Sequence, residues 1–188
     1  PSPWALGLRE GPRGSPSAGQ LPNWVTSAIR LMTYDVAIFG DLLIAEAELR
    51  RWKRAEIGSR GNRAIAKAFP GSKNDAPQKQ VALVAELAKA GFFRLEESDG
   101  LVRVRGQFHG LAFRKRARAL AALFIAAARF GAEGTVTFLG EGVWVGYEIF
   151  LHAGRAQLRV MTEDEVRRAA QDPAHLVLGH HAKLCSPR

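Results

Sequence analysis

Residues 135–161 alternate between apolar and polar side chains in three runs, and this pattern constrains the fold more than any other part of the sequence. Gly140, Gly142 and Gly154 interrupt the alternation. A period of two residues between turns is typical of an antiparallel meander that buries one face. We therefore expect three strands within 134–161. Their buried face consists of Val136 and Phe138 in the first strand, Tyr147, Ile149 and Leu151 in the second, and Leu158 and Val160 in the third.

Two more alternating runs lie within residues 92–108, on either side of Asp99-Gly100. This dipeptide is the strongest short signal for a two-residue hairpin turn. Such a turn places Arg94 opposite Arg105, and two like charges in this position are mildly destabilising. A bound anion or a neighbouring carboxylate is therefore expected there. The other face of the hairpin is apolar and is expected in the core, with Phe93, Leu95, Val102 and Val104.

The longest expected helix covers residues 111–130, where apolar side chains recur at helical spacing and form one broad face. Arg116 is the exception, because it projects into that apolar face. We favour the interpretation that its side chain runs along the edge of the core to reach water. The alternative is an arginine that is paired at an interface. The opposite face is a basic stripe of Arg114, Lys115, Arg118 and Arg129.

Shorter elements surround these segments. Residues 33–44 predict a strand in which Gly40 marks a bulge or bend. Residues 45–56 and 63–69 predict short helices, and a capping box opens a further helix over residues 162–173.

A helix is also expected over residues 77–90, where Asp75 and Gln78 have the spacing of a capping box. Its apolar stripe would be Val81, Val84, Leu87 and Ala88. The fold class that follows is α+β. We expect an antiparallel sheet, made of the hairpin 92–108 and the meander 134–161, with the amphipathic helices 77–90 and 111–130 packed on one face.

The chain of 188 residues is 47% hydrophobic, which fits one globular domain over residues 32–188. Residues 1–31 contain five of the nine prolines, so we expect a disordered or artificially added leader, with Met32 as the natural start. No apolar run approaches the ~20 residues of a membrane span, and the N-terminal residues lack a secretory pattern. Cys185 is the single cysteine. These features predict a soluble, cytoplasmic protein with no membrane partner.

The net charge of +9 is the strongest anomaly in the composition, and residues 32–188 alone carry 24 basic and 17 acidic side chains. A basic balance favours an anionic partner, such as nucleic acid, an acidic protein or a membrane surface. The alternative is an arginine-rich bias of the source proteome without functional meaning.

Catalytic and metal-binding patterns are weak. The glycines within 140–146 lie between strands, and a phosphate-binding loop needs a helix N-terminus instead. His180, His181 and Cys185 lack the spacing of zinc ligands. We therefore expect no enzyme activity, metal or cofactor. Trp144 fits edge packing and an aromatic binding anchor equally well. Four carboxylates have no assigned partner: Asp35, Asp41, Glu141 and Glu148.

Two stretches resemble a known class of proteins. The run GEGVWVGYEIF at 140–150, followed by a strand that ends in LRV at 158–160, is similar to a strand pair of bacterial polymorphic-toxin immunity proteins. The run MTYDVAIFGDLLI at 32–44, followed by AELRRW at 47–52, resembles the start of proteins associated with myxobacterial swarm-inhibition immunity. The resemblance implies a cytoplasmic, non-enzymatic protein that binds and neutralises one cognate toxin. Immunity proteins against nuclease toxins are usually acidic, so this basic domain would suit a toxin with an acidic active face.

Three functions follow as hypotheses. The first is an immunity-type inhibitor of an acidic toxin, and the alternative is a nucleic-acid-binding module that uses the basic helix and hairpin with weak, salt-sensitive affinity. An enzyme of unknown class is the third and is disfavoured. The expected partner surface combines two basic sets with one aromatic side chain, namely Arg94, Arg103 and Arg105 of the hairpin, Arg114, Lys115 and Arg118 of the helix, and Trp144.

Overall fold

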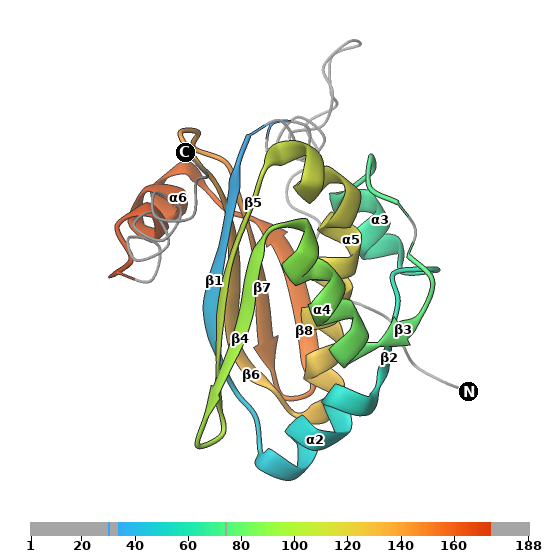
Figure 1. Cartoon of the computed structure of the whole chain (residues 1–188). Helices are drawn as coiled ribbons and strands as arrows, with labels where there is room; N and C mark the ends of the chain where they lie inside the picture. Colours follow the sequence, from blue (N-terminus) through green and yellow to red (C-terminus); the bar gives the residue numbers. More distant parts are fainter. Residues whose placement is uncertain (1–29, 31–33, 74, 174–188) are drawn as a thin grey trace, which may run out of the picture.

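The computed structural model describes residues 30, 34–73 and 75–173. Their main feature is a six-stranded sheet, in which every pair of neighbouring strands is antiparallel and the order is β4-β5-β1-β6-β7-β8 (Figure 1). The expected α+β fold is confirmed. Except for Arg30, the expected leader lies outside the described residues, and its interpretation stays a prediction. The strands are β1 (Val36–Leu43), β4 (Phe92–Ser98), β5 (Leu101–Phe108), β6 (Glu133–Gly140), β7 (Gly146–His152) and β8 (Arg155–Val160).

Helices cover the two faces of this sheet unequally (Figure 1). Among the described residues, four helices lie on one face, which we call the helix side, and a single short helix, α6 (Glu163–Ala170), lies on the other, which we call the open side. The helix side holds α2 (Glu46–Arg54), α3 (Arg63–Ala68), α4 (Gln80–Ala90) and α5 (Gly110–Ala127, continued by a 3-10 turn at Ala128–Phe130), together with the short ribbon of β2 (Glu56–Ile57) and β3 (Gln78–Lys79).

The core lies between the helix side and the sheet, as the alternation predicts. Phe138 is fully buried and its ring packs 6.1 Å from Phe113 and 6.2 Å from Phe124, both of α5. Tyr147 of β7 packs 5.0 Å from Phe69, and its burial raises the pKa of the phenol strongly. The expected buried faces of β6 and β7 and most of that of helix 111–130 are confirmed, whereas Leu158 and Val160 of β8 are only partly buried.

The hairpin has the expected register. Asp99 and Gly100 both have positive φ, +48° and +80°, as a two-residue turn with the twist of a hairpin requires. Arg94 pairs with Arg105 across the hairpin. Both side chains therefore point to the open side, because the alternate residues of β5, such as Val104, are buried against the helices.

The start of α4 differs from the expectation. The chain remains extended through Lys79, because Gln78 and Lys79 pair with β2. The helix therefore begins at Gln80, and no side chain of the predicted capping box caps it. Its buried stripe is also shifted, because Leu83 is buried while Val81 is mostly exposed. The predicted capping box of this helix was wrong, because pairing of β2 with β3 sets where it starts. Its predicted stripe was right in part, since Leu87 is buried and Val84 packs against the core.

Arg116 is 28% exposed at the edge of the core, and it is also paired with carboxylates within the chain, which neither interpretation included. Its guanidinium lies 2.5 Å from a carboxylate oxygen of Glu86 and 3.8 Å from one of Asp75. Burial raises the pKa of Asp75, and the nearby Arg116 opposes this only in part. One carboxylate oxygen of Asp75, Oδ2, is buried without a hydrogen bond. The cluster ties the segment before α4 to α5.

Replacing Asp75 with Asn should stabilise the protein increasingly as the pH rises from 3 to 7. The pKa of Asp75 is higher in the folded protein than its unfolded value of 3.8. The stability that the protonated carboxyl group gives the fold is therefore lost as the pH rises through the folded pKa. An amide cannot lose that proton. Thermal unfolding of both proteins across this range is the measurement, and a difference that does not change with pH would contradict the expectation.

Gly40 marks a close approach of two strands and not a bulge. Its register is continuous on both sides, with Val104 of β5 and Val136 of β6. Gly40 and Gly134 are the two positive-φ residues inside strands among the described residues, at +155° and +135°. A Cβ on Gly40 would lie 2.0 Å from the carbonyl oxygen of Thr135, and one on Gly134 would lie 2.2 Å from that of Asp41.

Gly40→Ala should therefore lower the free energy of unfolding by about 3 kcal/mol, because it adds a backbone clash to an unfavourable φ. Gly131→Ala is the matched control, since Gly131 has φ +70° with open space around a Cβ. It should cost only about 1 kcal/mol. Denaturant titrations measure both, and equal costs would show that the clash at Gly40 is relieved by a small shift.

Candidate functional site

The open side of the sheet presents side chains in rows that run across all six strands. The register aligns these rows, because directly paired residues of antiparallel strands point to the same face. The first row contains Arg94, Arg105, Phe39, Thr137, Glu148 and Arg159. The second contains Glu96, Arg103, Asp41, Thr135, Phe150 and Gln157.

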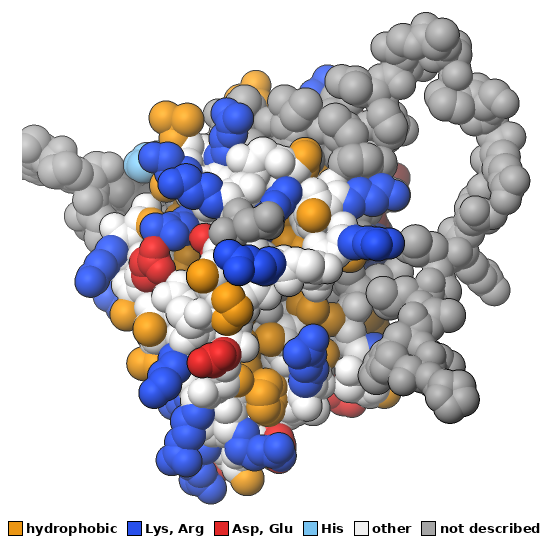
Figure 2. All heavy atoms as spheres, turned by 90° about the vertical axis from the view of Figure 1, so that its right-hand side faces the viewer, with side chains coloured by type: hydrophobic (Ala, Val, Ile, Leu, Met, Phe, Trp, Pro, Cys, Tyr) orange, Lys and Arg blue, Asp and Glu red, His pale blue; other side chains and the backbone are white. Residues whose placement is uncertain are grey.

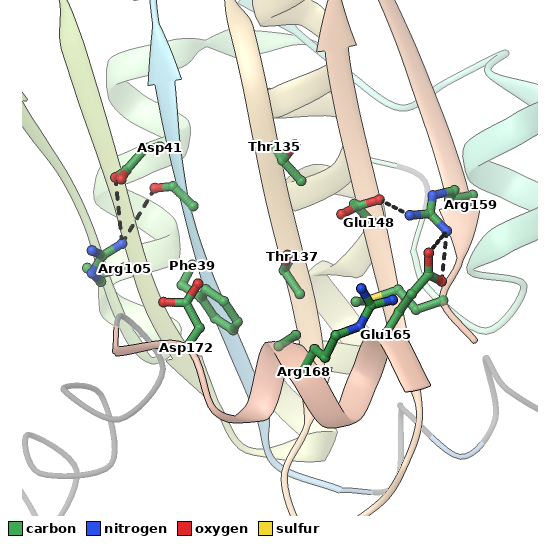
Figure 3. Close-up of a pocket in the computed structure, with 13 residues that line it drawn as sticks. Phe39, Asp41, Arg105, Thr135, Thr137, Glu148, Arg159, Glu165, Arg168 and Asp172 are labelled. Carbon is green, nitrogen blue, oxygen red and sulfur yellow. Dashed lines mark hydrogen bonds and ion pairs between the residues drawn. The ribbon is translucent and has the colours of Figure 1, made fainter. Parts of the chain in front are cut away.

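Helix α6 covers one end of this face. Thr162 and Glu165 form the expected capping box, which is confirmed. A small second core holds the helix on the sheet through Val166, Ala37, Phe39, Leu139 and Met161. Beside α6 the sheet carries a groove of about 530 Å³, and both rows contribute to its floor and walls (Figure 3).

One wall of the groove is a fixed chain of charges. Arg159 of β8 lies 2.5 Å from a carboxylate oxygen of Glu148 and 2.9 Å from both of Glu165 (Figure 3). The hydrogen bonds from Arg159 and from the backbone N–H of Thr162 lower the pKa of Glu165 to about 2. The same contact with Glu165 raises the pKa of Arg159. These groups satisfy one another and hold α6 in place.

The other wall contains the hairpin arginines. Arg105 is mostly buried, and its guanidinium donates to the carbonyl oxygen of Val104 at 2.6 Å. Asp41 lies 3.5 Å from Arg103 and 4.0 Å from Arg105, while Arg94 turns away and stacks over a phenylalanine ring at 5.3 Å. Asp41 is thus the neighbouring carboxylate that the like-charge pair predicts.

The floor of the groove carries polar groups that could still form hydrogen bonds or ion pairs with a ligand. Within the described residues, the hydroxyls of Thr135 and Thr137 make no hydrogen bond, and Arg168 has no carboxylate partner. The Nε of Arg168 donates to the carbonyl oxygen of Asp164 at 3.3 Å, and its guanidinium reaches from α6 over the floor (Figure 3). These three residues were not predicted as site residues from the sequence, although the alternation places both threonines opposite the buried face of β6.

The two basic sets of the expected partner surface do not form one surface. Arg103 and Arg105 lie on the open side, whereas Arg114 and Lys115 belong to α5 on the helix side. Arg118 is used inside the fold: its Nε donates to the carbonyl oxygen of Phe69 at 2.8 Å, and Nη2 reaches those of Pro70 at 3.3 Å and Ala66 at 3.5 Å. It thereby satisfies free carbonyls at the end of α3.

Hydrogen bonds to Asp35 join three segments at one end of the molecule. The carbonyl oxygen of Asp35 accepts from the backbone N–H of Glu141 at 2.7 Å, and its carboxylate accepts from that of Gly110 at 3.3 Å. Tyr34, the start of α5 and the turn after β6 therefore meet at this end. Three large side chains are exposed here by 45%, 75% and 52%, namely Tyr34, Leu111 and Trp144.

We call Tyr34, Leu111, Arg114, Lys115 and Trp144 the apical surface. Arg167 of α6 stacks on the Trp144 ring at 4.5 Å, so this tryptophan is held in place yet stays half exposed. Edge packing and a role as a binding anchor both stay predictions for Trp144, because the ring is about half exposed and half covered.

The surplus of positive charge lies on the helix side. Figure 2 looks onto it and shows Lys and Arg side chains spread over the face with few Asp or Glu between them. On the open side, by contrast, Arg103, Arg105 and Arg159 each have a carboxylate within 4.0 Å. The basic residues of the helix side that form no ion pair in the described part of the chain are Arg54, Arg60, Arg63, Lys73, Lys79, Lys89, Arg114, Lys115 and Arg129.

All four carboxylates without an assigned partner have one in the structure. Asp35 faces His109 at 3.1 Å, and Glu141 accepts from the amide of Gln107 at 3.1 Å. Among residues 30, 34–73 and 75–173, no cluster of His, Cys, Asp and Glu could hold a metal ion, and no helix has the length and apolarity to span a membrane. The weak metal candidates His180, His181 and Cys185 lie outside the described residues.

Comparisons with known proteins add no relative: no family model, no curated protein and no solved structure matches this chain.

Glu165→Gln should lower the thermal stability at neutral pH, and the deficit should shrink as the pH falls from 4.5 towards 2. The pKa of Glu165 is lower in the folded protein than in the unfolded chain, so its carboxylate stabilises the fold above the unfolded pKa. This stabilisation is lost as the carboxylate of the wild-type protein becomes protonated. Glu163→Gln, which removes an exposed pair with Arg167, is the control and should change little. A deficit that persists unchanged at pH 2 would contradict this assignment.

Proposed function

We propose that the protein is a non-enzymatic, immunity-type inhibitor that binds a cognate toxin through its apical surface. The observation that carries the proposal is that Tyr34, Leu111 and Trp144 are all exposed and belong to chain segments that meet at one end of the sheet, where Arg114 and Lys115 form no ion pair with a described residue. Tyr, Trp and Arg dominate the binding energy of protein interfaces. Exposed apolar side chains that are gathered, and not scattered, mark interaction sites.

The charge of this end favours an acidic partner. Arg114 and Lys115 lie in the first turns of α5, which hold no acidic residue of their own, and the carboxylate of Asp35 accepts from the N–H of Gly110 at the start of the helix. Neither basic residue forms an ion pair with a described carboxylate. An acidic toxin face would supply the missing negative charge and would accelerate association by electrostatic attraction. The cytoplasmic location stays part of this proposal.

Trp144 gives the surface its apolar anchor. The cation of Arg167 over its ring fixes the side chain before binding, so little conformational entropy is lost when a partner covers it. The half-exposed ring can still bury substantial area against a partner.

Charge reversal separates the apical surface from the hairpin arginines. We expect Arg114→Glu with Lys115→Glu to weaken toxin binding at least tenfold, or about 1.4 kcal/mol. We expect Arg103→Glu with Arg105→Glu to change it less, because Asp41 already lies near both arginines. The ligand is the product of the gene beside this one, if it is a toxin, and calorimetry measures the affinity. Unchanged binding in the folded apical variant would refute the proposed surface.

Duplex DNA and single-stranded RNA serve as the competing ligands in the same assay. The broad basic face in Figure 2 would bind them through phosphate contacts, whose affinity falls steeply between ~50 and ~200 mM salt. We expect only weak binding that disappears at the higher salt. Sequence-specific binding that persists there would favour a nucleic-acid function and overturn the inhibitor proposal.

A further inference from the structure

The groove beside α6 has the size and lining of a small-molecule site. Its volume of about 530 Å³ falls within the range of roughly 300–1,000 Å³ that ligand sites occupy. Its lining comes from the open side of the sheet and from α6, so it shares no residue with the apical surface (Figure 3).

The strands under the groove are held in an unusual backbone conformation. Asp41 and Thr135 are paired with each other, and the positive-φ residues Gly40 and Gly134 lie next to them in β1 and β6. Positions where only glycine fits are rare inside strands and cluster at functional sites. Here they fix the backbone of two residues whose side chains face the groove.

The four groups that could contact a ligand form a line across the groove, with opposite charges at its two ends. Asp41, about half exposed, stands at one end, with Arg103 at 3.5 Å and Arg105 at 4.0 Å on its β5 side. Arg168 of α6 stands at the other end (Figure 3). The hydroxyls of Thr135 and Thr137 lie between them, without hydrogen bonds to described residues.

The remaining charges of the groove are engaged elsewhere, including Asp172 at the end of α6, which also lines the groove and is not free. Glu148, Arg159 and Glu165 are bound to one another, and the guanidinium of Arg105 is held on a backbone carbonyl. Arg103 approaches Asp41 from β5, whereas the groove reaches Asp41 from β6, on its other side.

We propose that this groove binds a small zwitterion, with its cationic group at Asp41 and its carboxylate at Arg168. The two threonine hydroxyls would hydrogen-bond the ligand between its ends. Thr135 and Thr137 are two residues apart on one strand, which is roughly 7 Å. The two charges of the ligand must therefore be at least that far apart, as in an ω-amino acid or a short peptide, and glycine is too short.

Four matched compounds test the charge pattern and its length. ε-Aminocaproate carries both charges at a long separation, caproate carries only the anion, hexylamine only the cation, and glycine both at a short separation. We expect ε-aminocaproate to bind with a millimolar or tighter Kd, and the other three at least tenfold more weakly. Calorimetry gives the affinities, and amide chemical shifts in NMR spectra locate the binding.

Two variants and two controls test the residues. Asp41→Asn and Arg168→Gln should each weaken ε-aminocaproate binding at least tenfold. Glu133→Gln and Arg155→Gln remove charges at the far ends of β6 and β8 and should leave it unchanged. A thermal melt confirms that each protein is folded. No binding of ε-aminocaproate, equal binding of caproate or hexylamine, or full affinity in both folded groove variants would overturn the proposal.

Discussion

The double pairing of β1 is the interaction on which the rest of the structure depends. This strand pairs along its whole length with β5 on one edge and β6 on the other. Among the described strands, it alone joins the hairpin β4–β5 to the meander β6–β8. Gly40 and Gly134 allow the backbones of β1 and β6 to meet where any side chain would collide. The core on one face and the groove on the other are both consequences of this join.

The pairing of β1 with β5 and β6 also determines which charged side chains lie near a charge of opposite sign within the molecule. Because β1 lies beside β5, Asp41 comes close to Arg103 and Arg105, which would otherwise concentrate positive charge with Arg94. Arg114 and Lys115 on α5 form no ion pair with a carboxylate in the part of the chain that the structure describes. The protein's excess charge is therefore displaced to the helix side, and a proposal based on net charge alone could not have located it.

The sequence predicted those features that depend on local pattern and short-range turns. The hairpin register follows from Asp99-Gly100, and the buried face of the meander follows from the alternation. Features that depend on distant pairing could not be predicted. The ribbon of β2 and β3 delays the start of α4, and Asp75 meets Arg116 only through tertiary packing. The groove could not be foreseen either, because the sequence did not show which face of the sheet α6 would cover.

Helix α6 connects the two surfaces that we propose for binding. Arg167 stacks on Trp144 at the apical surface, and the adjacent Arg168 reaches into the groove. Neighbouring residues of a helix point about 100° apart, so one helix can present side chains to both places. Its position depends on the capping box at Thr162 and on the bonds between Glu165 and Arg159. A ligand that pulled on Arg168 would therefore act on the element that orients Trp144, and this gives a physical route by which groove binding could alter the affinity for a protein partner.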